Sequence, residues 1–460
     1  MAFVAKKTYI CEKHKQMKKI LAIAATAVAI CANAQYSNSR KEEIKQYFAQ
    51  SLNGNEAVFT GKGKIAIKEI DKARSAVWQC WREAVAGTAE EKLPALLPAE
   101  ARDTIYWTMP THPEEGAQMP FHYIYKGEKP DSGYPLFLYM HGSGPKSAEW
   151  DTGYHLCRSF ADSPSAYFIP QIPSENHYRW AIQPQQWAWE KLLRLAFLSD
   201  SIDCNRIYFF GISEGGYGSQ RLASFYADYL AGAGPMAGGE PLQNAPCENL
   251  ANTAFSLRTG ERDYGFGRNY LTYVTNLTLD SLQAAHPGLY NHKIEIVPGM
   301  GHGINYETTT PWLAQFKRNP HPTYFYWENY EMYGRKRKGF YNLRADEEGC
   351  NEQERVCYEM SISDNTVTLN VNNVTYRTTR QMAGIPMTFH KTFTPATKGK
   401  VTIFLNEKLV DLKKPVKVIV NGKEVVNKKV KPTTKAMAES CALFNDPERL
   451  FPAAVQVTIE

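Results

Sequence analysis

The sequence lacks an apolar run long enough to cross a membrane. The apolar, alanine-rich stretch Ile20–Ile30 falls short of the ~20 residues that a spanning helix needs. A basic segment, Met17–Lys19, precedes this stretch, and Ala32–Ala34 follows it with the A-x-A shape of a cleavage site. These features predict a leader and signal peptide over residues 1–34, and a secreted or periplasmic protein without an integral membrane segment.

Two alternatives remain open for this N-terminus. The apolar stretch also fits a hydrophobic anchor, and Cys31 fits a lipoprotein, although Ile30 stands where a lipobox prefers a small residue. The residues before Met17 lie upstream of a complete signal, so either Met1 or Met17 is the true start.

The chain has little excess charge of either sign once the leader is set apart. Its formal net charge is +6 at pH 7. Residues 1–34 hold six lysines against one glutamate, so their removal takes away +5 and leaves +1. The basic balance belongs mostly to the leader and gives no reason to expect a nucleic-acid partner.

Cysteine is scarce, and its spacing excludes the common metal sites. Nine cysteines are present, and two of them, Cys11 and Cys31, lie in the leader, so an odd number remains. Because export permits disulfides, Cys350 and Cys357 form the first pair to test. No C-x-x-C or His/Cys spacing suggests a zinc site, and no metal is expected.

The pattern of apolar residues along the chain changes near residue 104. Residues 35–103 are polar, with helical spacing of apolar positions over Lys41–Leu52 and Lys68–Val85. Apolar strands then alternate with helical segments, which is typical of a mostly parallel sheet with helices on both faces. The predicted elements of this part are Thr104–Thr108, Phe121–Tyr125, Tyr134–Met140, Ala166–Pro170, Gln183–Leu198, Arg206–Phe210, Tyr217–Leu230, Phe255–Thr259 and Lys293–Val297.

The alternation stops at a proline-rich boundary near residues 310–322. Beyond it Thr366–Tyr376 alternates like a strand, and Asn421–Gly422 is a two-residue hairpin signal. The sequence therefore predicts a leader, an N-terminal helical segment over 35–103, an α/β domain over 104–322 and a small β-rich module over 323–460. Within the module we expect a helix at Thr433–Phe444 and strands at Val401–Leu405, Val416–Val420 and Ala453–Ile459.

One pentapeptide carries the strongest chemical signal. Gly211–Gly215 reads G-x-S-x-G between an apolar strand and a helical segment, which is the context of a nucleophile elbow. Glycines suit the turn because a Cβ at either position would clash with neighbouring backbone. Ser213 is the predicted nucleophile.

A base and an acid follow Ser213 in the order that such a fold requires. His302 lies among glycines directly after one predicted strand, and Asp263 follows another. Serine needs a base to take its proton, and the base needs a carboxylate to orient it. We expect His302 and Asp263 in these roles, with Glu261 as the local rival for the acid.

The loop after Tyr134–Met140 supplies the remaining part of such a site. It reads H-G-S-G, and Gly142 lets the backbone approach a substrate carbonyl. We expect the oxyanion hole at Gly142 and Ser143, completed by the backbone N–H of Glu214, with His141 in a structural role. Trp150 and Glu240 are candidates for substrate binding, although a core tryptophan and a solvated glutamate are the simpler interpretations. Trp180, Trp187 and Trp189 are weaker candidates of the same kind.

Together these motifs resemble the α/β-hydrolase superfamily, which implies a doubly wound, mostly parallel sheet. The segment Asp203–Tyr208, with Thr310–Leu313 and Arg318–Pro322, is similar to segments of secreted serine esterases of the polyhydroxybutyrate depolymerase and feruloyl esterase group. Glu214 departs from the His, Met, Asn or Gln that usually follows the serine there, so the substrate preference of that group does not carry over. Residues beyond 322 resemble C-terminal β extensions of bacterial hydrolases.

The resemblance and the residues imply a secreted serine hydrolase that cleaves carboxylic esters through an acyl-enzyme, without metal or organic cofactor. The substrate would be a small-molecule or polysaccharide-linked ester, and the oligomeric state stays open. One alternative is a serine peptidase of the prolyl-oligopeptidase type, which usually has a propeller before its catalytic domain and ends soon after its histidine. The other is a catalytically silent hydrolase fold used for binding, which the complete Ser/Asp/His set disfavours.

Overall fold

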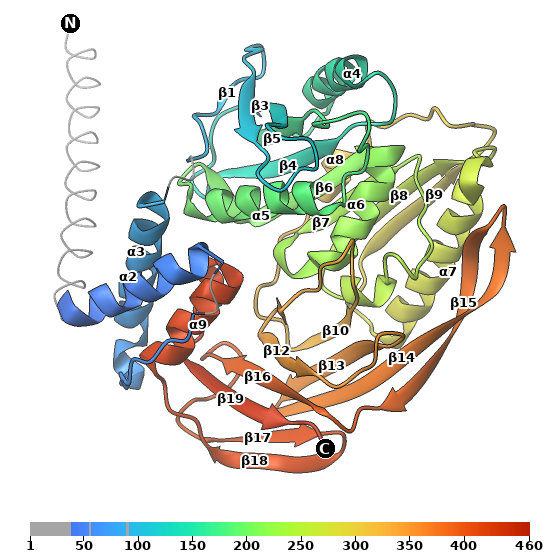
Figure 1. Cartoon of the computed structure of the whole chain (residues 1–460). Helices are drawn as coiled ribbons and strands as arrows, with labels where there is room; N and C mark the ends of the chain where they lie inside the picture. The colour runs from blue at the N-terminus through green and yellow to red at the C-terminus, as the bar shows by residue number, and fades with distance from the viewer. Residues whose placement is uncertain (1–37, 55–56, 89–91) are drawn as a thin grey trace, which may run out of the picture. The chain divides into compact units, whose positions relative to one another are not determined.

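The computed structural model describes residues 38–54, 57–88 and 92–460, and the chain divides into two compact units (Figure 1). The smaller unit comprises Met1–Glu90 and Val430–Ala454, and the larger comprises Glu91–Lys429 and Val455–Glu460. The predicted leader, including Cys11 and Cys31, lies outside the described residues. This division differs from the four segments predicted from the sequence, whose boundaries stay a prediction.

The described part of the smaller unit is helical. It holds α2 (Asn38–Leu52), a short 3-10 turn (Ile67–Glu69), α3 (Ile70–Ala86) and α9 (Thr434–Phe444). Phe48 of α2 meets Trp81 of α3 edge to face at a centroid distance of 5.0 Å. The predicted helix near Thr433 is confirmed, and the Thr433 side chain caps it by accepting a hydrogen bond from the backbone of Ala436.

A large, mostly parallel sheet forms the centre of the larger unit. Within the described residues its order is β1-β3-β5-β4-β6-β7-β8-β9, with β2 paired to β3. From β5 to β9 every neighbouring pair is parallel, whereas β3 runs antiparallel to β5. The strands are β1 (Leu97–Pro98), β2 (Ile105–Thr108), β3 (Gln118–Lys126), β4 (Tyr134–Met140), β5 (Ser165–Pro170), β6 (Ile202–Ile212), β7 (Gly232–Met236), β8 (Ala254–Gly260) and β9 (His292–Val297).

The central strands form because their side chains are apolar on both faces. All seven residues of β4 are buried, as are all six of β5, which matches a sheet covered on both sides. Phe137 of β4 stacks on Tyr208 of β6 at a centroid distance of 4.7 Å. The covering helices are α4 (Lys146–Ser159), α5 (Gln183–Leu198), α6 (Glu214–Phe225), α7 (Arg268–Ala285) and α8 (Thr309–Leu313).

The predicted strands of this part are confirmed, and the helix predictions are partly corrected. The helix predicted over Tyr217–Leu230 begins earlier, at Glu214, and ends at Phe225, with a 3-10 turn at Ala227–Tyr229. The strand order is that of the α/β-hydrolase fold. It places the carboxyl ends of β4, β6, β8 and β9 at one edge, where the candidate site lies.

The β-rich part of the larger unit consists of two smaller sheets. In the described chain one has the order β10-β13-β14-β17-β18, with β15 paired to β14, and the other has the order β11-β12-β16-β19. The predicted hairpin at Asn421–Gly422 is confirmed, with positive φ values of 46° and 81°. The strands are β10 (Tyr324–Asn329), β11 (Gly339–Phe340), β12 (Leu343–Glu348), β13 (Arg355–Ser363), β14 (Thr366–Met382), β15 (Ile385–Pro395), β16 (Gly399–Leu405), β17 (Pro415–Val420), β18 (Lys423–Lys429) and β19 (Ala453–Thr458).

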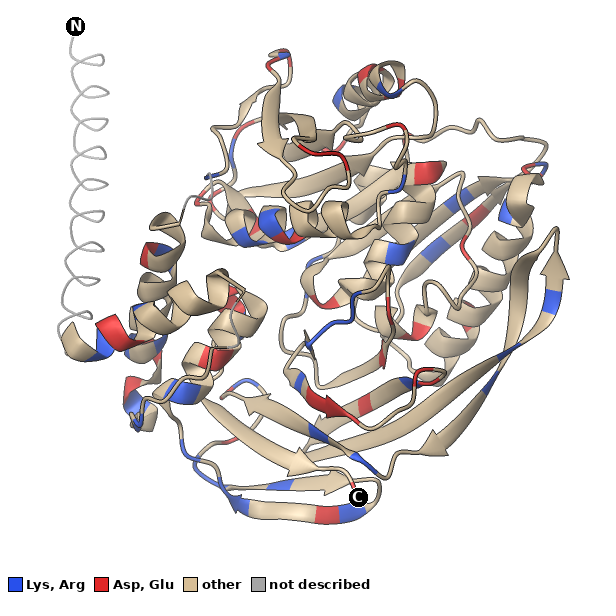
Figure 2. Cartoon of the chain, in the orientation of Figure 1, with Lys and Arg blue, Asp and Glu red and all other residues tan. Residues whose placement is uncertain are grey.

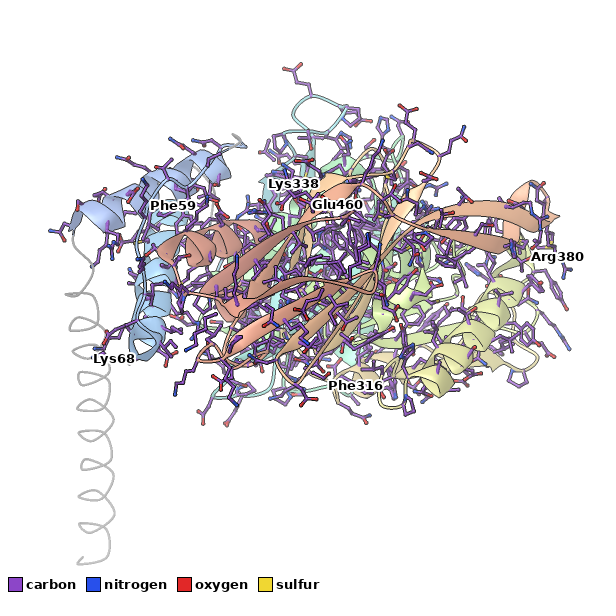
Figure 3. The ribbon with its side chains drawn as sticks, turned by 90° about the horizontal axis from the view of Figure 1, so that it is seen from below. Phe59, Lys68, Phe316, Lys338, Arg380 and Glu460 are labelled. Carbon is purple, nitrogen blue, oxygen red and sulfur yellow. The ribbon has the colours of Figure 1, made fainter. Side chains whose placement is uncertain are left out.

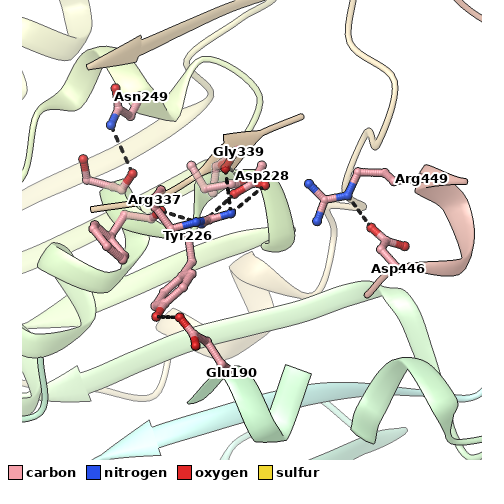
Figure 4. Close-up of polar contacts among 12 residues, drawn as sticks. Glu190, Tyr226, Asp228, Asn249, Arg337, Gly339, Asp446 and Arg449 are labelled. Carbon is pink, nitrogen blue, oxygen red and sulfur yellow. Dashed lines mark hydrogen bonds and ion pairs between the residues drawn. The ribbon is translucent and has the colours of Figure 1, made fainter. Parts of the chain in front are cut away.

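Buried ion pairs join these sheets to the α/β part of the same unit. Arg337 donates through both terminal nitrogens to the two carboxylate oxygens of Asp228, each at 3.1 Å, and also to the carbonyl oxygens of Phe225 and Gly339 (Figure 4). The Asp228 side chain is fully buried. A bidentate pair of this kind fixes geometry as well as adding energy.

The described chain gives no sign of a membrane-spanning helix. None of its helices combines the length and apolarity that a span requires. Figure 2 shows acidic and basic residues interspersed along the helices and strands of the larger unit.

Candidate active site

Ser213 lies on a strained turn between β6 and α6. Its φ is 57° and its ψ is −111°, a conformation that side chains adopt only where the surroundings enforce it. A Cβ on Gly211 would lie 2.5 Å from the carbonyl oxygen of Met140, and a Cβ on Gly215 would collide with the same oxygen. The two glycines therefore allow β6 and α6 to pack against β4 while the serine is held at the turn.

The structure brings the three predicted triad residues together. His302 Nε2 lies 3.0 Å from Ser213 Oγ, and His302 Nδ1 lies 2.8 Å from Asp263 Oδ2. Asp263 is buried with 3% exposure, so its charge requires partners. The rival acid Glu261 faces elsewhere and accepts a hydrogen bond from the backbone N–H of Gly299.

Arg268 holds the acid and was not anticipated from the sequence. Its Nε and Nη2 donate to Asp263 Oδ1 at 2.8 and 2.6 Å, and its Nη1 donates to the Tyr217 hydroxyl at 3.1 Å. Burial opposes ionisation of Asp263, but the hydrogen bonds from Arg268 and His302 lower the pKa of the carboxyl below its ordinary value. Arg268 opens α7, a helix that the sequence patterns did not identify, which is why its role was missed.

The H-G-S-G loop is braced by polar contacts. His141 is fully buried; its Nε2 accepts from the Ile172 N–H and its Nδ1 lies 2.8 Å from the carbonyl oxygen of Gly142. The same carbonyl accepts from the Tyr178 hydroxyl at 2.6 Å. Burial lowers the pKa of His141 to about 4, so the ring is neutral and structural, as expected. Ser143 lines the cavity in front of Ser213.

Glu214 has its backbone and its side chain in different roles. It opens α6, where the first N–H groups have no intrahelical acceptor and can serve an oxyanion. Its carboxylate is buried and accepts from Arg179 Nη1 at 2.5 Å. Burial, reinforced by the nearby charge of Glu240, raises the pKa of Glu214 to about 7 despite the opposing charge of Arg179.

The triad opens into a cavity of about 600 Å³. Ser213 and His302 line it together with residues of the α/β part and of the β-rich part. The other lining residues are Ser143, Arg179, Ala181, Glu214, Tyr217, Gly218, Arg221, Gly239, Glu240, Pro241, Asn244, Phe266, Arg268, Leu271, Tyr333, Gly384, Ile385 and Pro386.

The β14–β15 hairpin brings the β-rich part to the rim of this cavity. The hairpin runs beside α7 in Figure 1, and Arg380, labelled in Figure 3, lies near its outer end. The Arg380 guanidinium lies 4.4 Å from the ring centroid of Tyr270 on α7. The turn of the hairpin supplies Gly384 and Ile385 to the cavity wall, so residues outside the α/β part shape the site.

Of the two residues predicted to bind substrate, one lies in the cavity and one does not. Glu240 lines the cavity, but it is buried rather than solvated and accepts two hydrogen bonds from Arg221, at 2.7 and 3.2 Å. Trp150 is not among the lining residues; its indole stacks on the His122 ring at a centroid distance of 4.2 Å and donates to the carbonyl oxygen of Ile169. The weaker candidates Trp180, Trp187 and Trp189 are likewise absent from the lining residues.

The remaining sequence expectations concern thiols and metals. Cys350 and Cys357 are each free thiols, so the predicted pairing of these two residues is not formed. Cys357 is buried on β13, whereas Cys350 lies in the loop that precedes this strand. Among the described residues no group of three or more His, Cys, Asp or Glu side chains is arranged to hold a metal ion.

The strand order and the serine at the β6–α6 turn define a protein of the α/β-hydrolase fold. No protein-family model and no curated protein matches the sequence. Similar solved structures include a thermostable esterase, with 22% identity, a TM-score of 0.37, and coverage of 47% of this chain and 63% of that chain. The chain therefore spans less than two thirds of that esterase.

Two further solved structures are matched by this chain over nearly the whole of their own length. A fluorophosphonate-binding serine hydrolase of Staphylococcus aureus shows 14% identity and a TM-score of 0.33, over 46% of this chain and 97% of that chain. A ferulic acid esterase shows 13% identity and a TM-score of 0.33, over 46% and 97% respectively. At these identities the likeness concerns the fold alone.

Proposed function

We propose that this protein is an exported serine hydrolase that cleaves carboxylic esters. The observation that carries the proposal is the hydrogen-bonded chain from Ser213 through His302 to Asp263, which opens into a cavity beside backbone donors. Kinship with the polyhydroxybutyrate depolymerase and feruloyl esterase group is part of the proposal and rests on the sequence motifs. Export rests on the leader, which lies outside the described residues.

The geometry supports acyl transfer in two stages. Ser213 Oγ attacks the ester carbonyl while His302 Nε2 takes its proton, and Asp263 holds Nδ1–H so that this tautomer persists. The N–H of Glu214 and the Ser143 loop stabilise the oxyanion. The alcohol leaves with the proton from His302, and water then attacks the acyl-enzyme with His302 again as base.

A fluorophosphonate probe tests the enzymatic part of the proposal directly. The wild-type protein is expected to become labelled covalently, because the probe reacts with a serine activated by a base. Ser213→Ala is expected to give no label under conditions in which the wild type is labelled completely. Equal labelling of the two proteins, measured by in-gel fluorescence, would assign the reaction to another residue and contradict the proposal.

The choice between ester and amide substrates needs a second measurement. Short p-nitrophenyl esters are expected to turn over faster than proline-containing peptide amides. Faster hydrolysis of the amides would favour the peptidase alternative over the esterase.

Ile385 provides a test of whether the β-rich part contacts the substrate. Its side chain is half-buried at the cavity wall, so Ile385→Ala removes apolar contact from a bulky ester. We expect KM for such an ester to rise by about fivefold, and kcat/KM for p-nitrophenyl acetate to change by less than about twofold. Val425→Ala, on the exposed β18, is the matched control and is expected to alter neither value. An equal fall with both esters would contradict a substrate contact.

A further inference from the structure

Three arginines, Arg179, Arg221 and Arg268, line the cavity. Two of them, Arg221 and Arg268, form ion pairs with buried carboxylates. Arg221 donates through Nε and Nη2 to both oxygens of Glu240, whose side chain is 5% exposed. Arg268 donates through Nε and Nη2 to Asp263, whose side chain is 2% exposed. The Nε and Nη2 edge that would grip a ligand is therefore already occupied in both residues.

Arg179 differs from the other two in exposure and in partners. Its side chain is 60% exposed, against 24% for Arg221 and 11% for Arg268. Of the three guanidinium nitrogens of Arg179, only Nη1 has a hydrogen-bond partner among the described residues. It donates to Glu214 Oε2 at 2.5 Å and to the carbonyl oxygen of Tyr178 at 3.5 Å. The Nε and Nη2 edge of this guanidinium stays available to a molecule in the cavity.

The carboxylate that Arg179 meets is a weak counter-charge. Glu214 is buried close to a second acid, Glu240, and its pKa of about 7 means that it is partly protonated near neutral pH. Asp263 and Glu240 each face their own arginine. The charge of Arg179 is therefore the one least balanced among the three arginines, and Arg179 lines the same cavity as Ser213.

We propose that Arg179 receives a carboxylate of the ester substrate, so that this enzyme prefers anionic esters over neutral ones of the same shape. A guanidinium edge matches a carboxylate in a bidentate manner, which a lysine would not reproduce. The charge belongs either to the acyl part or to the alcohol part of the ester. The inference rests on the proposed ester hydrolysis.

Matched pairs of esters that differ only in charge provide the kinetic test. p-Nitrophenyl hydrogen adipate against p-nitrophenyl methyl adipate places the charge on the acyl side, and p-acetoxybenzoate against p-acetoxybenzamide places it on the alcohol side. In one of the pairs, wild-type kcat/KM is expected to be about tenfold higher for the charged ester. A ratio near one in both pairs would overturn the proposal.

Variants separate recognition from a merely structural role. Arg179→Gln is expected to remove the preference, and Arg179→Lys to keep part of it, with neutral esters changed by less than about twofold. Arg158→Gln, an exposed arginine on α4 outside the cavity lining, is the control for loss of one positive charge. An equal fall of Arg179→Gln on charged and neutral esters would contradict the assignment.

Substitution of Glu214 is expected to strengthen the preference for charged esters, whereas substitution of Arg179 weakens it. Because Glu214 competes for Arg179, Glu214→Gln is expected to raise the preference for the charged ester by about threefold. In the wild type the same ratio is expected to rise as the pH falls through about 7, where Glu214 gains its proton while Arg179 and Arg221 keep their charges. Glu240 and Tyr178 also face Glu214, and a ratio unaffected by the Glu214→Gln substitution would contradict this competition.

Binding measured without turnover distinguishes this inference from the proposed function. Adipate is expected to raise the Tm of the wild-type protein and to leave that of Arg179→Gln unchanged. A protein that binds adipate through Arg179 but hydrolyses no ester would overturn the esterase proposal and leave the carboxylate site standing. No shift in either protein would overturn the carboxylate site.

Discussion

Asp263→Asn is expected to lower kcat/KM for an activated ester by about 10⁴-fold in a protein that still folds. Arg268 donates two hydrogen bonds to Oδ1, so the amide oxygen of the substituted side chain will face Arg268. The amide nitrogen will then face His302 Nδ1, where in the wild type the carboxylate oxygen accepts a hydrogen bond from Nδ1–H. That contact favours the tautomer with hydrogen on Nε2, which cannot accept the proton of Ser213.

Steady-state kinetics with a p-nitrophenyl ester, together with thermal unfolding, measures this effect. Glu261→Gln is the matched control, because Glu261 lies on the same loop and contacts the Gly299 backbone instead of the histidine. It is expected to retain kcat/KM within about threefold, since the glutamine oxygen can still accept this exposed hydrogen bond. A larger loss in Glu261→Gln than in Asp263→Asn would show that the acid has been assigned to the wrong carboxylate.

The site residues that could be predicted lie within a few residues of a strand end and are marked by a local sequence pattern. Ser213 has its glycines beside it, and His302 and Asp263 follow apolar strands in the chain order that the fold requires. Arg179 and Tyr333 reach the cavity only through tertiary packing, so no local pattern marks them. Trp150 packs against the core, and its sequence context could not separate that place from a pocket, because aromatic residues serve both equally well.

The helices and strands follow the same rule: those with a clear local pattern were predicted, and those that depend on tertiary packing were not. Tyr134–Met140 is apolar throughout and forms β4 with those bounds. Helix α7 was missed because Thr, Tyr and Asn, which are poor helix formers, are frequent in Arg268–Ala285, and packing against β8 and β9 stabilises it instead. Helix α4 contains Gly153, which lowers its helix propensity but permits close contact with the ring of Tyr139.

The second large effect is expected on stability, at the buried cluster around Glu328. This side chain is fully buried on β10 and accepts from Arg355 at 2.7 Å, from Lys391 at 3.0 Å and from the Tyr376 hydroxyl at 2.6 Å. Burial opposes its ionisation, but the two cations lower the pKa of Glu328 below its ordinary value. Its contribution to stability is therefore present above the pKa of the unfolded chain and is lost as the pH falls through the lower pKa of the folded state.

Glu328→Gln is expected to reduce the free energy of unfolding by about 3 kcal/mol, because it leaves Arg355 and Lys391 undercompensated in a buried site. Lys391 keeps one partner, Glu248 of the α/β part, at 2.7 Å, which limits the loss. Glu424→Gln, exposed on β18, is the control and is expected to change stability by less than about 0.5 kcal/mol.

Because the β14–β15 hairpin lines the cavity, hydrolysis of the activated ester is expected to disappear in the same denaturant transition as the fold. An unchanged denaturation midpoint in Glu328→Gln would contradict the stabilising role of Glu328. Activity that survives unfolding of the β-rich part would show that the two parts unfold independently.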